Sequence, residues 1–513
     1  MSEGFPSPAT RRMPIRDAIV DVPGARLVGP DDVTISGITY DSRTVQPGDL
    51  FAALRGSDFD GHRYIDAAVQ RGAAAILAEE PVDASVPVIV VENSRAALAP
   101  LSATFQGHPS RDLTMIGLTG TDGKTTTSYL VRHILQHAGI QTGLIGTVGI
   151  EIGDGTTHNL PHQTTPESNL VQGYLREMVD RGTSAAVLEA TSHGLAMHRL
   201  DGTRFTIAGV TNITHEHLEY HGTIENYRRA KAILLERVAA DGGVVVLNAD
   251  DEGARAVAEY AEGAPIVWYS MESPSAELVA GDVVVDGDGS RFVLRTDTGE
   301  FPVSLPMLGE FNVANALCAI GVTSAAGVDG QDAVAALATA SGVPGRMNRV
   351  VEGQSFNVVV DYAHTPESIG KVLRLLRRLH SGRRLIAVSG SAGERDPFKR
   401  PLQGAVMAEL ADVTIVTSED PRNEDPDKII REIGDGAREK GAVDGETLFE
   451  ITDRRDAIRK AFEIARDGDC VLLAGKGHET SMIWGFEHRP WNEEAVAREE
   501  LRALGFRPNE VTT

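Results

Sequence analysis

A glycine-rich loop, Gly120-Thr121-Asp122-Gly123-Lys124-Thr125-Thr126-Thr127, constrains this chain more than any other segment. An apolar run, Leu113 to Leu118, precedes the loop, and a helical pattern, Ser128 to Ala138, follows it. In a strand, loop and helix of this kind, successive backbone N–H groups turn toward an anion and the helix N-terminus adds positive potential. Lys124 can reach the outer phosphates and Thr125 can hold Mg²⁺. The segment therefore predicts binding of ATP or GTP.

The loop departs from the strict spacing G-x-x-x-x-G-K-[ST] at one place. Leu118 stands where the first glycine of that pattern belongs. A glycine-rich structural turn is the alternative interpretation. The buried strand before the loop, the helix after it and an acidic residue that closes a later strand favour the nucleotide site.

The charge of the chain excludes some partners. Its 513 residues carry a formal net charge of −24. Such a surface repels nucleic acids and anionic membranes, so we expect neither as a partner. An anionic substrate must instead be held by local groups.

The cysteine content and the N-terminus bear on localisation. Cys318 and Cys470 lie far apart in apolar surroundings, which is typical of two buried thiols in a reducing compartment. The N-terminus, Ser2 to Arg12, lacks the apolar core of a signal peptide, and no run of 18 apolar residues occurs. We expect a soluble cytoplasmic protein without membrane insertion, and a monomer.

Alternating apolar strands and helical stretches predict an α/β fold of three domains. Residues 1–110 form a small α/β domain, with strands at Leu50 to Leu54, Ala74 to Leu77 and Val88 to Val91. Residues 111–343 form the central domain, a parallel sheet covered by helices on both faces. The central domain has its strands and appended hairpin at Leu113 to Leu118, Leu144 to Ile150, Ala185 to Leu188, Phe205 to Val210 and 279–305.

A third α/β series occupies residues 344–513. Its expected strands are Phe356 to Val360, Leu385 to Val388, Val413 to Val416 and Cys470 to Leu473. Gly342 to Gly345 would carry the hinge before it. This domain resembles the doubly wound sheets that bind ligands at the carboxyl ends of their strands.

Two polar features follow strands of the central domain. Glu189 ends the strand Ala185 to Leu188, where a carboxylate can hold Mg²⁺ beside phosphates. The segment Thr211 to His221 contains three histidines, but no His/Cys set completes a structural zinc site. One histidine that contributes to a Mg²⁺ or phosphate site is the preferred interpretation.

Lys231 lies within the apolar stripe of the helix that begins after Thr223. The ordinary interpretation is a lysine whose stem packs along the core while its ammonium reaches water. A lysine held there can also lose its charge, and a neutral amine can react.

Three loops follow strands of the third domain and together indicate a binding site. Glu419-Asp420-Pro421-Arg422 combines two carboxylates with an arginine that can grip a carboxylate with two bonds. The other two loops are Gly390-Ser391-Ala392-Gly393-Glu394-Arg395 and Gly475-Lys476-Gly477-His478-Glu479.

These segments, in this order and spacing, resemble the Mur ligase family over nearly the whole chain. The segments that carry the resemblance are Gly120 to Thr127, Leu188 to Gly194, Glu216 to Gly222, Gly309 to Asn315, Pro344 to Met347 and Asp361 to Pro366. Within the family, the third-domain loops resemble those of the ligases that join a diamino acid to UDP-N-acetylmuramoyl-L-alanyl-D-glutamate.

The resemblance implies a reaction and a cofactor set. The γ-carboxylate of D-Glu attacks the γ-phosphate of ATP, and an amine of the diamino acid displaces phosphate from the acyl phosphate. This is a step of peptidoglycan precursor synthesis. A carboxylate resists attack by an amine until its oxygen becomes a good leaving group, which agrees with that order. Lys231 matches the family's carbamylated lysine.

The family's residue roles carry over by position. The ATP site would comprise Gly120, Thr121, Asp122, Gly123, Lys124, Thr125, Thr126, Asn312, Arg346 and Asp361. The catalytic group would comprise Lys124, Glu189, His217 and Lys231, and the Mg²⁺ ligands Thr125, Glu189, His217 and carbamylated Lys231. The UDP-muramoyl peptide would meet Tyr40, Ser42, Ser57, Asp58, Phe59, Thr164, Thr165, Ser192, Met197 and Arg199, with Met197 in place of the family's glutamine. The incoming amino acid would meet Arg395, Glu419, Asp420, Pro421, Arg422, Gly475 and Glu479.

The acceptor loop departs from the family pattern. Many diaminopimelate ligases have Asp-Asn-Pro-Arg where this chain has Glu419-Asp420-Pro421-Arg422. Arg422 can pair with the distal carboxylate of meso-diaminopimelate, whereas the added charge of Asp420 favours a side chain that ends in ammonium. We expect meso-diaminopimelate, with L-lysine or L-ornithine as alternatives. A ligase like folylpolyglutamate synthase and a non-catalytic nucleotide-binding protein are the other hypotheses.

Overall fold

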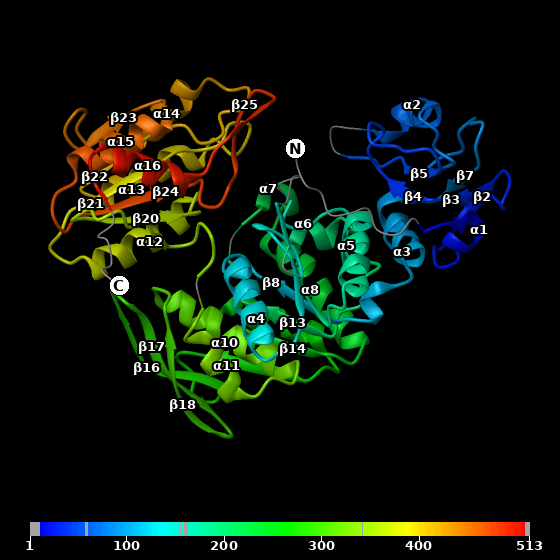
Figure 1. The fold of residues 1–513 in the computed structure, drawn as a ribbon, viewed down its shortest axis with the longest axis horizontal. Coiled ribbons are helices and arrows are strands. Elements are labelled where there is room, and N and C mark those ends of the chain that lie inside the picture. The colour runs from blue at the N-terminus through cyan, green and yellow to red at the C-terminus, as the bar shows by residue number, and fades with distance from the viewer. Residues whose placement is uncertain are drawn as a thin grey trace. The chain divides into compact units, whose positions relative to one another are not determined.

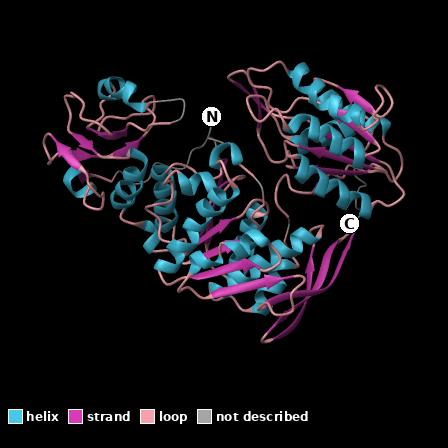
Figure 2. Cartoon of the chain, turned by 180° about the vertical axis from the view of Figure 1, so that it is seen from behind, coloured by secondary structure: helices cyan, strands magenta, loops and turns pink. Residues whose placement is uncertain are grey.

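The computed structural model describes residues 11–56, 60–153, 155–158, 163–214, 216–340 and 342–507. The chain divides into two compact units, and we describe each by itself. Unit 1 contains residues 1–284, 290–305 and 310–340, and unit 2 contains residues 285–289, 306–309 and 341–513. The predicted α/β class is confirmed (Figures 1 and 2).

The N-terminal part of unit 1 is a five-stranded sheet, coloured blue in Figure 1, in the order β2-β7-β6-β5-β4. β4 to β7 are parallel and β2 is antiparallel to β7. Its strands are β2 (Arg26–Val28), β4 (Gly37–Thr39), β5 (Asp49–Ala52), β6 (Ala75–Ala78) and β7 (Val88–Val90), beside the β1–β3 pair (Met13–Pro14 and Thr34–Ile35). Its helices are α1 (Ile15–Ala18), α2 (Ile65–Gln70) and α3 (Ser94–Gln106).

An eleven-stranded sheet forms the rest of unit 1, in the order β11-β10-β9-β12-β8-β13-β14-β15-β16-β17-β18. The strands from β9 through β16 in that order are parallel. The eleven strands are β8 (Thr114–Thr119), β9 (Thr142–Ile145), β10 (Gly149–Ile152), β11 (Gly155–His158), β12 (Ala185–Glu189), β13 (Ile207–Val210), β14 (Val244–Asn248), β15 (Ile266–Ser270), β16 (Leu278–Asp286), β17 (Gly289–Thr296) and β18 (Gly299–Leu305). The helices are α4 (Lys124–His137), α5 (Ser168–Asp180), α6 (Ser192–Ala196), α7 (Leu218–His221), α8 (Ile224–Ala240), α9 (Glu252–Ala256), α10 (Glu310–Ala325) and α11 (Gly330–Leu337).

Helices cover both faces of the parallel strands, as the unbroken apolar runs predict. Met115 and Leu188 pack with α5 and α8 in one buried cluster. α4 and α10 pack against each other and against strands of the same sheet. Both Met115 and its neighbour Ile116 have no exposed surface, because successive side chains of β8 point to opposite faces.

Two predicted elements differ from the structure. The expected strand Leu144 to Ile150 is two strands, because the chain turns at Gly146, whose N–H donates to Gly149 O at 3.1 Å, and β10 returns antiparallel to β9. A Cβ on Gly146 would lie 2.2 Å from Glu189 Oε1, so a larger residue here would displace the Glu189 carboxylate. The hairpin expected at 279–305 has a third strand, because the chain turns again between β17 and β18.

Unit 2 contains a six-stranded sheet in the order β19-β20-β24-β21-β22-β23, parallel except for β19. The strands are β19 (Asn348–Arg349), β20 (Asn357–Asp361), β21 (Leu385–Ser389), β22 (Val413–Val416), β23 (Leu448–Glu450) and β24 (Cys470–Ala474), with a hairpin of β25 (Ser481–Trp484) and β26 (Glu487–Pro490). The helices are α12 (Pro366–Leu379), α13 (Lys399–Leu410), α14 (Pro426–Glu439), α15 (Arg454–Ile464) and α16 (Glu493–Ala503).

The strands of unit 2 are buried on both faces. Val358 and Val360 pack with α15 and α16, whereas Val359, between them, packs with α12 and α13. Parallel strands end at one edge of a sheet, so the loops after β20, β21, β22 and β24 emerge together. Within the described ranges, no helix combines the length and the apolar composition needed to cross a lipid bilayer.

Candidate functional site

The glycine-rich loop connects β8 to α4, and its two glycines adopt conformations that side chains rarely reach. Gly120 has φ 149° and Gly123 has φ 85°. A Cβ on Gly120 would lie 1.9 Å from Thr211 Oγ1, so glycine is required there. The N–H of Thr121 donates to Asn212 O at 2.7 Å, which fixes the loop to the segment after β13. The loop thus has a defined shape before any ligand binds.

Lys124 is the first residue of α4, and its ammonium lies back over the loop. Nζ donates to Gly120 O and to Thr121 O, both at 2.9 Å. The cation is therefore held at the helix N-terminus, where the macrodipole also favours an anion.

Thr125 and Glu189 meet in a buried oxygen network. Glu189 has no exposed surface, and its Oε2 accepts from Thr125 Oγ1 at 2.9 Å. Thr147, which follows β9, donates its hydroxyl to Glu189 Oε2 at 2.9 Å and its N–H to Oε1 at 3.0 Å. A hydroxyl and a carboxylate are hard oxygen donors of the kind that Mg²⁺ prefers, and Mg²⁺ takes few protein ligands besides phosphates. The donor set therefore fits Mg²⁺.

Lys231 of α8 is buried against the same loop. The residue is 1% exposed, its Nζ donates to Gly120 O at 2.6 Å, and it lies 4.6 Å from the centre of the Tyr227 ring. The pKa of Lys231 lies well below its ordinary value. Burial is the largest cause and the nearby charge of Lys124 is the second, while the charges of Glu216 and Asp122 act in the opposite direction. The expectation that Lys231 lies inside the apolar stripe is confirmed.

His217 precedes α7 with a left-handed φ of 55° and belongs to an aromatic cluster. Its ring centre lies 4.7 Å from that of His193 and 6.5 Å from that of Tyr227. Tyr227 also contacts Lys231, so its ring is a neighbour of both the histidine and the buried lysine. No three His, Cys, Asp or Glu side chains of the described ranges cluster as a ready-made metal centre.

Asn312 of α10 reaches the phosphate loop through a neighbour that the sequence analysis did not single out. Asn315 Nδ2 donates to Asn312 Oδ1 at 3.2 Å, and Thr127 Oγ1 donates to Asn315 Oδ1 at 3.4 Å. A Cβ on Gly123 would lie 2.3 Å from Asn315 Oδ1. Asn315 therefore links α10 to the start of α4.

A second polar group of unit 1 joins α3, the segment before α5 and the end of α6. Arg199 pairs with Glu167 Oε1 at 3.1 Å through Nε and donates through Nη1 to Thr165 O at 2.9 Å. Arg95 pairs with the same carboxylate oxygen at 2.6 Å. The pKa of Tyr40 is raised, mainly by burial and secondly by the negative charge of Glu167. Tyr40 and Arg199, far apart in the chain, thus share one electrostatic environment.

Other residues expected to meet the UDP-substrate have these positions. Ser42 is half-buried after β4, and Thr164 Oγ1 is hydrogen-bonded to Thr147 Oγ1 at 3.0 Å. Ser192 is buried at the start of α6, and Met197 directly follows that helix. Ser57, Asp58 and Phe59 lie outside the described residues.

In unit 2, Arg346 and Asp361 lie at the end of β20. Asp361 accepts from Met347 N at 2.8 Å and from Ala363 N at 2.7 Å, and burial raises its pKa. The Arg346 guanidinium lies 4.6 Å from the centre of the Tyr362 ring. The arginine and the carboxylate thus occupy neighbouring positions beside the Gly475 loop, since Gly475 N donates to Asp361 O at 3.1 Å.

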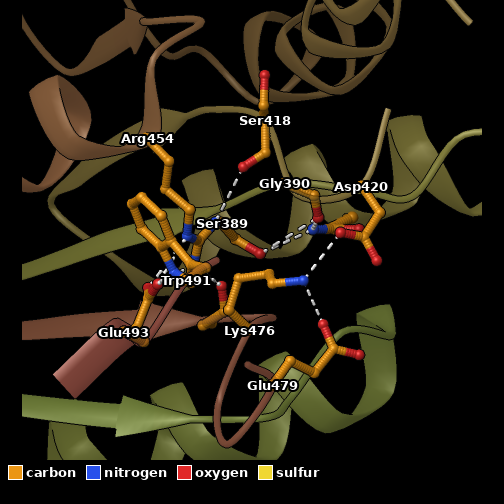
Figure 3. A network of polar contacts seen from close by, with 11 residues as sticks. Ser389, Gly390, Ser418, Asp420, Arg454, Lys476, Glu479, Trp491 and Glu493 are labelled. Atoms are coloured by element: carbon orange, nitrogen blue, oxygen red, sulfur yellow. Dashed lines mark hydrogen bonds and ion pairs between the residues drawn. The ribbon is translucent and has the colours of Figure 1, made fainter. Parts of the chain in front are cut away.

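A buried ion pair holds the two loops of unit 2 that follow β22 and β24. Arg454 and Glu493 side chains have no exposed surface and pair at 2.6 Å (Figure 3). Arg454 also donates to Ser418 O at 3.3 Å and to Ala474 O at 2.8 Å. Trp491 Nε1 donates to Glu493 Oε2 at 2.7 Å. One guanidinium therefore ties together the loops that bear Asp420 and Glu479.

Lys476 lies between Asp420 and Glu479, as Figure 3 shows. Its Nζ donates to Asp420 Oδ1 at 2.9 Å and to Glu479 Oε2, and the lysine has no exposed surface. Burial alone would lower the pKa of Lys476, but Glu479 and Asp420 outweigh burial and raise it. Burial raises the pKa of both Glu419 and Glu479.

The loops after β21 and β22 contain buried polar atoms that have no hydrogen-bond partner among the described residues. They are Ser391 Oγ, Thr417 Oγ1, Ser418 Oγ, Glu419 Oε2 and Arg422 Nε. Buried polar atoms are normally hydrogen-bonded, so this group indicates a place where a polar ligand completes the bonding. Arg395, on the loop that contains Ser391, is exposed, and Pro421 is buried.

The predicted residues thus gather in separate groups. One group, in unit 1, contains Gly120 to Thr126, Glu189 and Lys231. Another group, in unit 2, contains Asp420, Gly475 and Glu479. Sequence reasoning missed Thr147, Asn315, Tyr227, Glu167, Arg95, Arg454 and Glu493 as members of these groups. Thr147 was missed because it lies inside the run Leu144 to Ile150, which was predicted as one strand. The others carry no local signal that marks them.

Comparison with known proteins matches three segments of the chain to one family. Residues 34–106 match the Mur ligase family catalytic domain, residues 118–323 the Mur ligase middle domain, and residues 345–477 the Mur ligase glutamate ligase domain.

Relatives and a solved structure match over almost the full length. A UDP-N-acetylmuramyl-tripeptide synthetase of Roseiflexus sp. (strain RS-1) is 48% identical, covering 93% of this chain and 96% of its own. A UDP-N-acetylmuramoyl-L-alanyl-D-glutamate–2,6-diaminopimelate ligase of Geobacillus kaustophilus (strain HTA426) is 42% identical, covering 92% and 96%. A solved structure of a ligase with the latter name superimposes with a TM-score of 0.67 at 31% identity, covering 96% of this chain and 99% of the other.

Proposed function

The chain belongs to the Mur ligase family, and from this premise we propose that it joins meso-diaminopimelate to the D-Glu γ-carboxylate of UDP-N-acetylmuramoyl-L-alanyl-D-glutamate. ATP is cleaved to ADP and phosphate in this reaction. The observation that carries the proposal is the similarity over more than nine-tenths of the chain to two such enzymes. The relative at 48% identity is named a UDP-N-acetylmuramyl-tripeptide synthetase, and the relative at 42% identity is named as the 2,6-diaminopimelate ligase. The product is a peptidoglycan precursor.

The nucleotide loop supports the ATP-dependent half of the reaction. Gly120 to Thr126 would hold the phosphates, with Lys124 as the cation nearest to the transferring phosphoryl group. Asn312, Arg346 and Asp361 are carried over from the family as further ATP contacts. Phosphoryl transfer depends on positioning and charge stabilisation, which a rigid loop and a fixed lysine supply.

The proposed Mg²⁺ ligands are Thr125, Glu189, His217 and Lys231. When bound, Mg²⁺ neutralises charge on the transferring phosphoryl group. Lys231 would serve as a carbamate. A neutral amine attacks CO₂, forms an N–C bond and releases one proton, so that a cation site becomes an anion. Support comes from the burial of Lys231 and its lowered pKa, because the neutral form is the nucleophile. A ¹³C NMR carbamate signal after incubation with ¹³CO₂, absent from Lys231→Arg, tests this directly.

The UDP-substrate would bind at the group that contains Tyr40, Arg199, Thr165 and Ser192. Arg199 is half-buried and is held by Glu167, so it can present its remaining donors to an anionic substrate without a change of position. We assign the substrate role of residues 1–110 on the same basis.

The acceptor would bind at the loops of unit 2. Arg422 has a buried Nε with no partner among the described residues, and a distal carboxylate of the acceptor can accept from it. L-Lysine and L-ornithine lack that carboxylate. The geometry therefore favours meso-diaminopimelate over both alternatives.

We also propose a cytoplasmic monomer. The reaction consumes ATP, and all of the residues assigned above come from one chain. Light scattering of the purified protein at micromolar concentration tests the monomer, and a dimer mass contradicts it.

The decisive test measures phosphate release and product mass with ATP, Mg²⁺, the UDP-muramoyl dipeptide and each of the three acceptors. We expect a tripeptide product with meso-diaminopimelate at the highest kcat/KM. No phosphate release with any acceptor contradicts the ligase, and a preference for L-lysine or L-ornithine contradicts the acceptor assignment. Deletion of residues 1–107 should abolish turnover, because the UDP-substrate would lose its binding domain.

A further inference from the structure

Lys476 is a fully buried cation in the acceptor region, and the proposed function gives it no contact with substrate. Its Nζ donates to Asp420 Oδ1 at 2.9 Å and to Glu479 Oε2. Its side chain has no exposed surface, whereas those of Asp420 and Glu479 are 10% and 18% exposed. The lysine therefore lies behind the two carboxylates, away from solvent.

Three acidic side chains of the acceptor region lie near Lys476, and Lys399 adds a positive charge near Glu419. Glu419, Asp420 and Glu479 are all largely buried; after burial itself, the charge of Asp420 raises the pKa of both Glu419 and Glu479. Arg454 is bound to Glu493 and lies beneath the loops. Lys476 is the cation that bonds directly to two of the three carboxylates. Without it, like charges would face each other in a region of low dielectric.

The same contact fixes the backbone that carries Arg422. Asp420 Oδ1 accepts from Lys476 and also from Ile483 N at 2.9 Å, which belongs to β25. The Arg422 N–H donates to Ile483 O at 3.0 Å, and Gly485 N donates to Arg422 O at 2.7 Å. Arg422 itself has a left-handed φ of 53°. The Lys476–Asp420 bond thus braces the hairpin segment against which Arg422 is aligned.

We propose that Lys476 is a specificity-determining positioning residue, which neutralises Asp420 and Glu479 so that the acceptor site admits a diamino acid with a second carboxylate. This inference rests on the proposed function. The negative charge of Asp420 is compensated by Lys476, so it does not repel the distal carboxylate that Arg422 would bind. An acceptor with a distal ammonium alone does not need this compensation.

Charge removal at Lys476 should change acceptor selectivity. In Lys476→Met, two carboxylates lose their shared partner, and the site becomes more negative. We expect the ratio of kcat/KM for meso-diaminopimelate to kcat/KM for L-lysine to fall at least ~10-fold, since like charges at short range discriminate strongly. The KM values for ATP and for the UDP-substrate should stay unchanged.

Asp420→Asn gives the opposite test in a protein that keeps the lysine. It removes one negative charge while Lys476 stays bonded to Glu479, so the same ratio should rise by about 3-fold or more. In the double variant Lys476→Met/Asp420→Asn, the ratio should recover part of the loss. Lys476→Arg, which keeps the charge, should lose less than Lys476→Met.

Arg384→Met is the matched control. Arg384 pairs at 2.6 Å with the Asp469 side chain, which is 5% exposed. Asp469 precedes the amino end of β24, whereas Lys476 follows the carboxyl end, so this ion pair lies at the other end of the same strand. This variant should leave the selectivity ratio unchanged even if it lowers stability. Thermal unfolding of each variant separates a folding defect from a change in selectivity.

The outcomes distinguish the inference from the function on which it rests. An unmodified protein that turns over no acceptor contradicts the proposed function. An active protein in which Lys476→Met lowers turnover of both acceptors equally, or in which Asp420→Asn leaves the ratio unchanged, overturns the inference alone. If Lys476→Met does not fold, Asp420→Asn still decides.

Discussion

Two fully buried lysines, one in each unit, have opposite electrostatic environments. Lys231 is 1% exposed and Lys476 is 0% exposed. Lys231 bonds to a backbone carbonyl beside another lysine, and its pKa lies well below the ordinary value. Lys476 bonds to two carboxylates, and its pKa is raised. Burial alone therefore does not decide the charge of a lysine; its partners do.

This difference separates two kinds of chemistry. A lysine that can be neutral is a nucleophile, which suits the carbamate proposed at Lys231. A lysine that stays charged is a structural cation, which suits the role proposed for Lys476. The surroundings differ likewise: Lys231 and Lys124 both donate to the backbone carbonyl of Gly120, whereas the buried pair Arg454–Glu493 ties the loops near Lys476.

The largest expected effect tests the claim that ion pairs hold the region of unit 2. Arg454→Met leaves Glu493 buried without its partner and should lower stability by about 3–5 kcal/mol, measured by urea unfolding. Arg431→Met is the control, because the Arg431–Asp425 pair is more than half exposed, at 58% and 59%, and an exposed pair contributes at most about 1 kcal/mol. A double variant Arg454→Met/Glu493→Gln should lose less than the sum of the single losses. Strict additivity would contradict a coupled pair.

The second prediction tests the reactive lysine. Lys231→Ala should lower the rate of phosphate release at least about 30-fold, because a proposed metal ligand is lost. Short carboxylates such as formate should restore part of the rate by replacing the carbamate oxygens. Arg229→Ala, on the exposed face of the same helix, is the control and should retain the original rate. A Lys231→Ala rate close to the original, without any effect of carboxylates, would remove the carbamate from the account.

The third prediction concerns Arg422. Arg422→Ala should weaken meso-diaminopimelate by about 10-fold in kcat/KM, because a charge-assisted bond is lost, while L-lysine changes little. Competition between the two acceptors in one reaction, followed by mass spectrometry of the product, measures the ratio. Equal losses for both acceptors would argue against pairing with the distal carboxylate.

The smallest effect is a pair of opposite pH slopes. Between the lowered pKa of folded Lys231 and the ordinary lysine pKa of about 10.4, the unfolded chain binds a proton at Lys231 that the folded protein has released. The stability of the protein relative to Lys231→Met should therefore rise with pH in this window. Lys476 keeps its proton longer when folded, so stability relative to Lys476→Met should be constant below about 10.4 and fall above it. Unfolding midpoints in CO₂-free buffers check both. Slopes of the same sign would erase the contrast between the two lysines.

Local patterns were enough to predict much of the fold. The unbroken apolar runs before Gly120, Glu189 and Gly475 predicted parallel strands, and those strands are β8, β12 and β24. The predicted stripe of α8 correctly placed Lys231 inside the core. The turn at Gly146 was missed, because the local pattern does not show that Glu189, 43 positions later in the chain, lies against this glycine. Long-range contacts leave no period in the local sequence.

The residue types and their order in the chain established the phosphate loop, the α/β class and the family, because strand periodicity, glycine conformations and motif spacing are local properties. Folding in three dimensions determined which charges meet. Asp420 acquired Lys476 as its partner, Arg199 acquired Glu167, and Lys231 acquired a carbonyl in place of a carboxylate. The charge of a buried side chain depends on groups that the chain brings within a few ångströms from distant positions, and no local pattern encodes them.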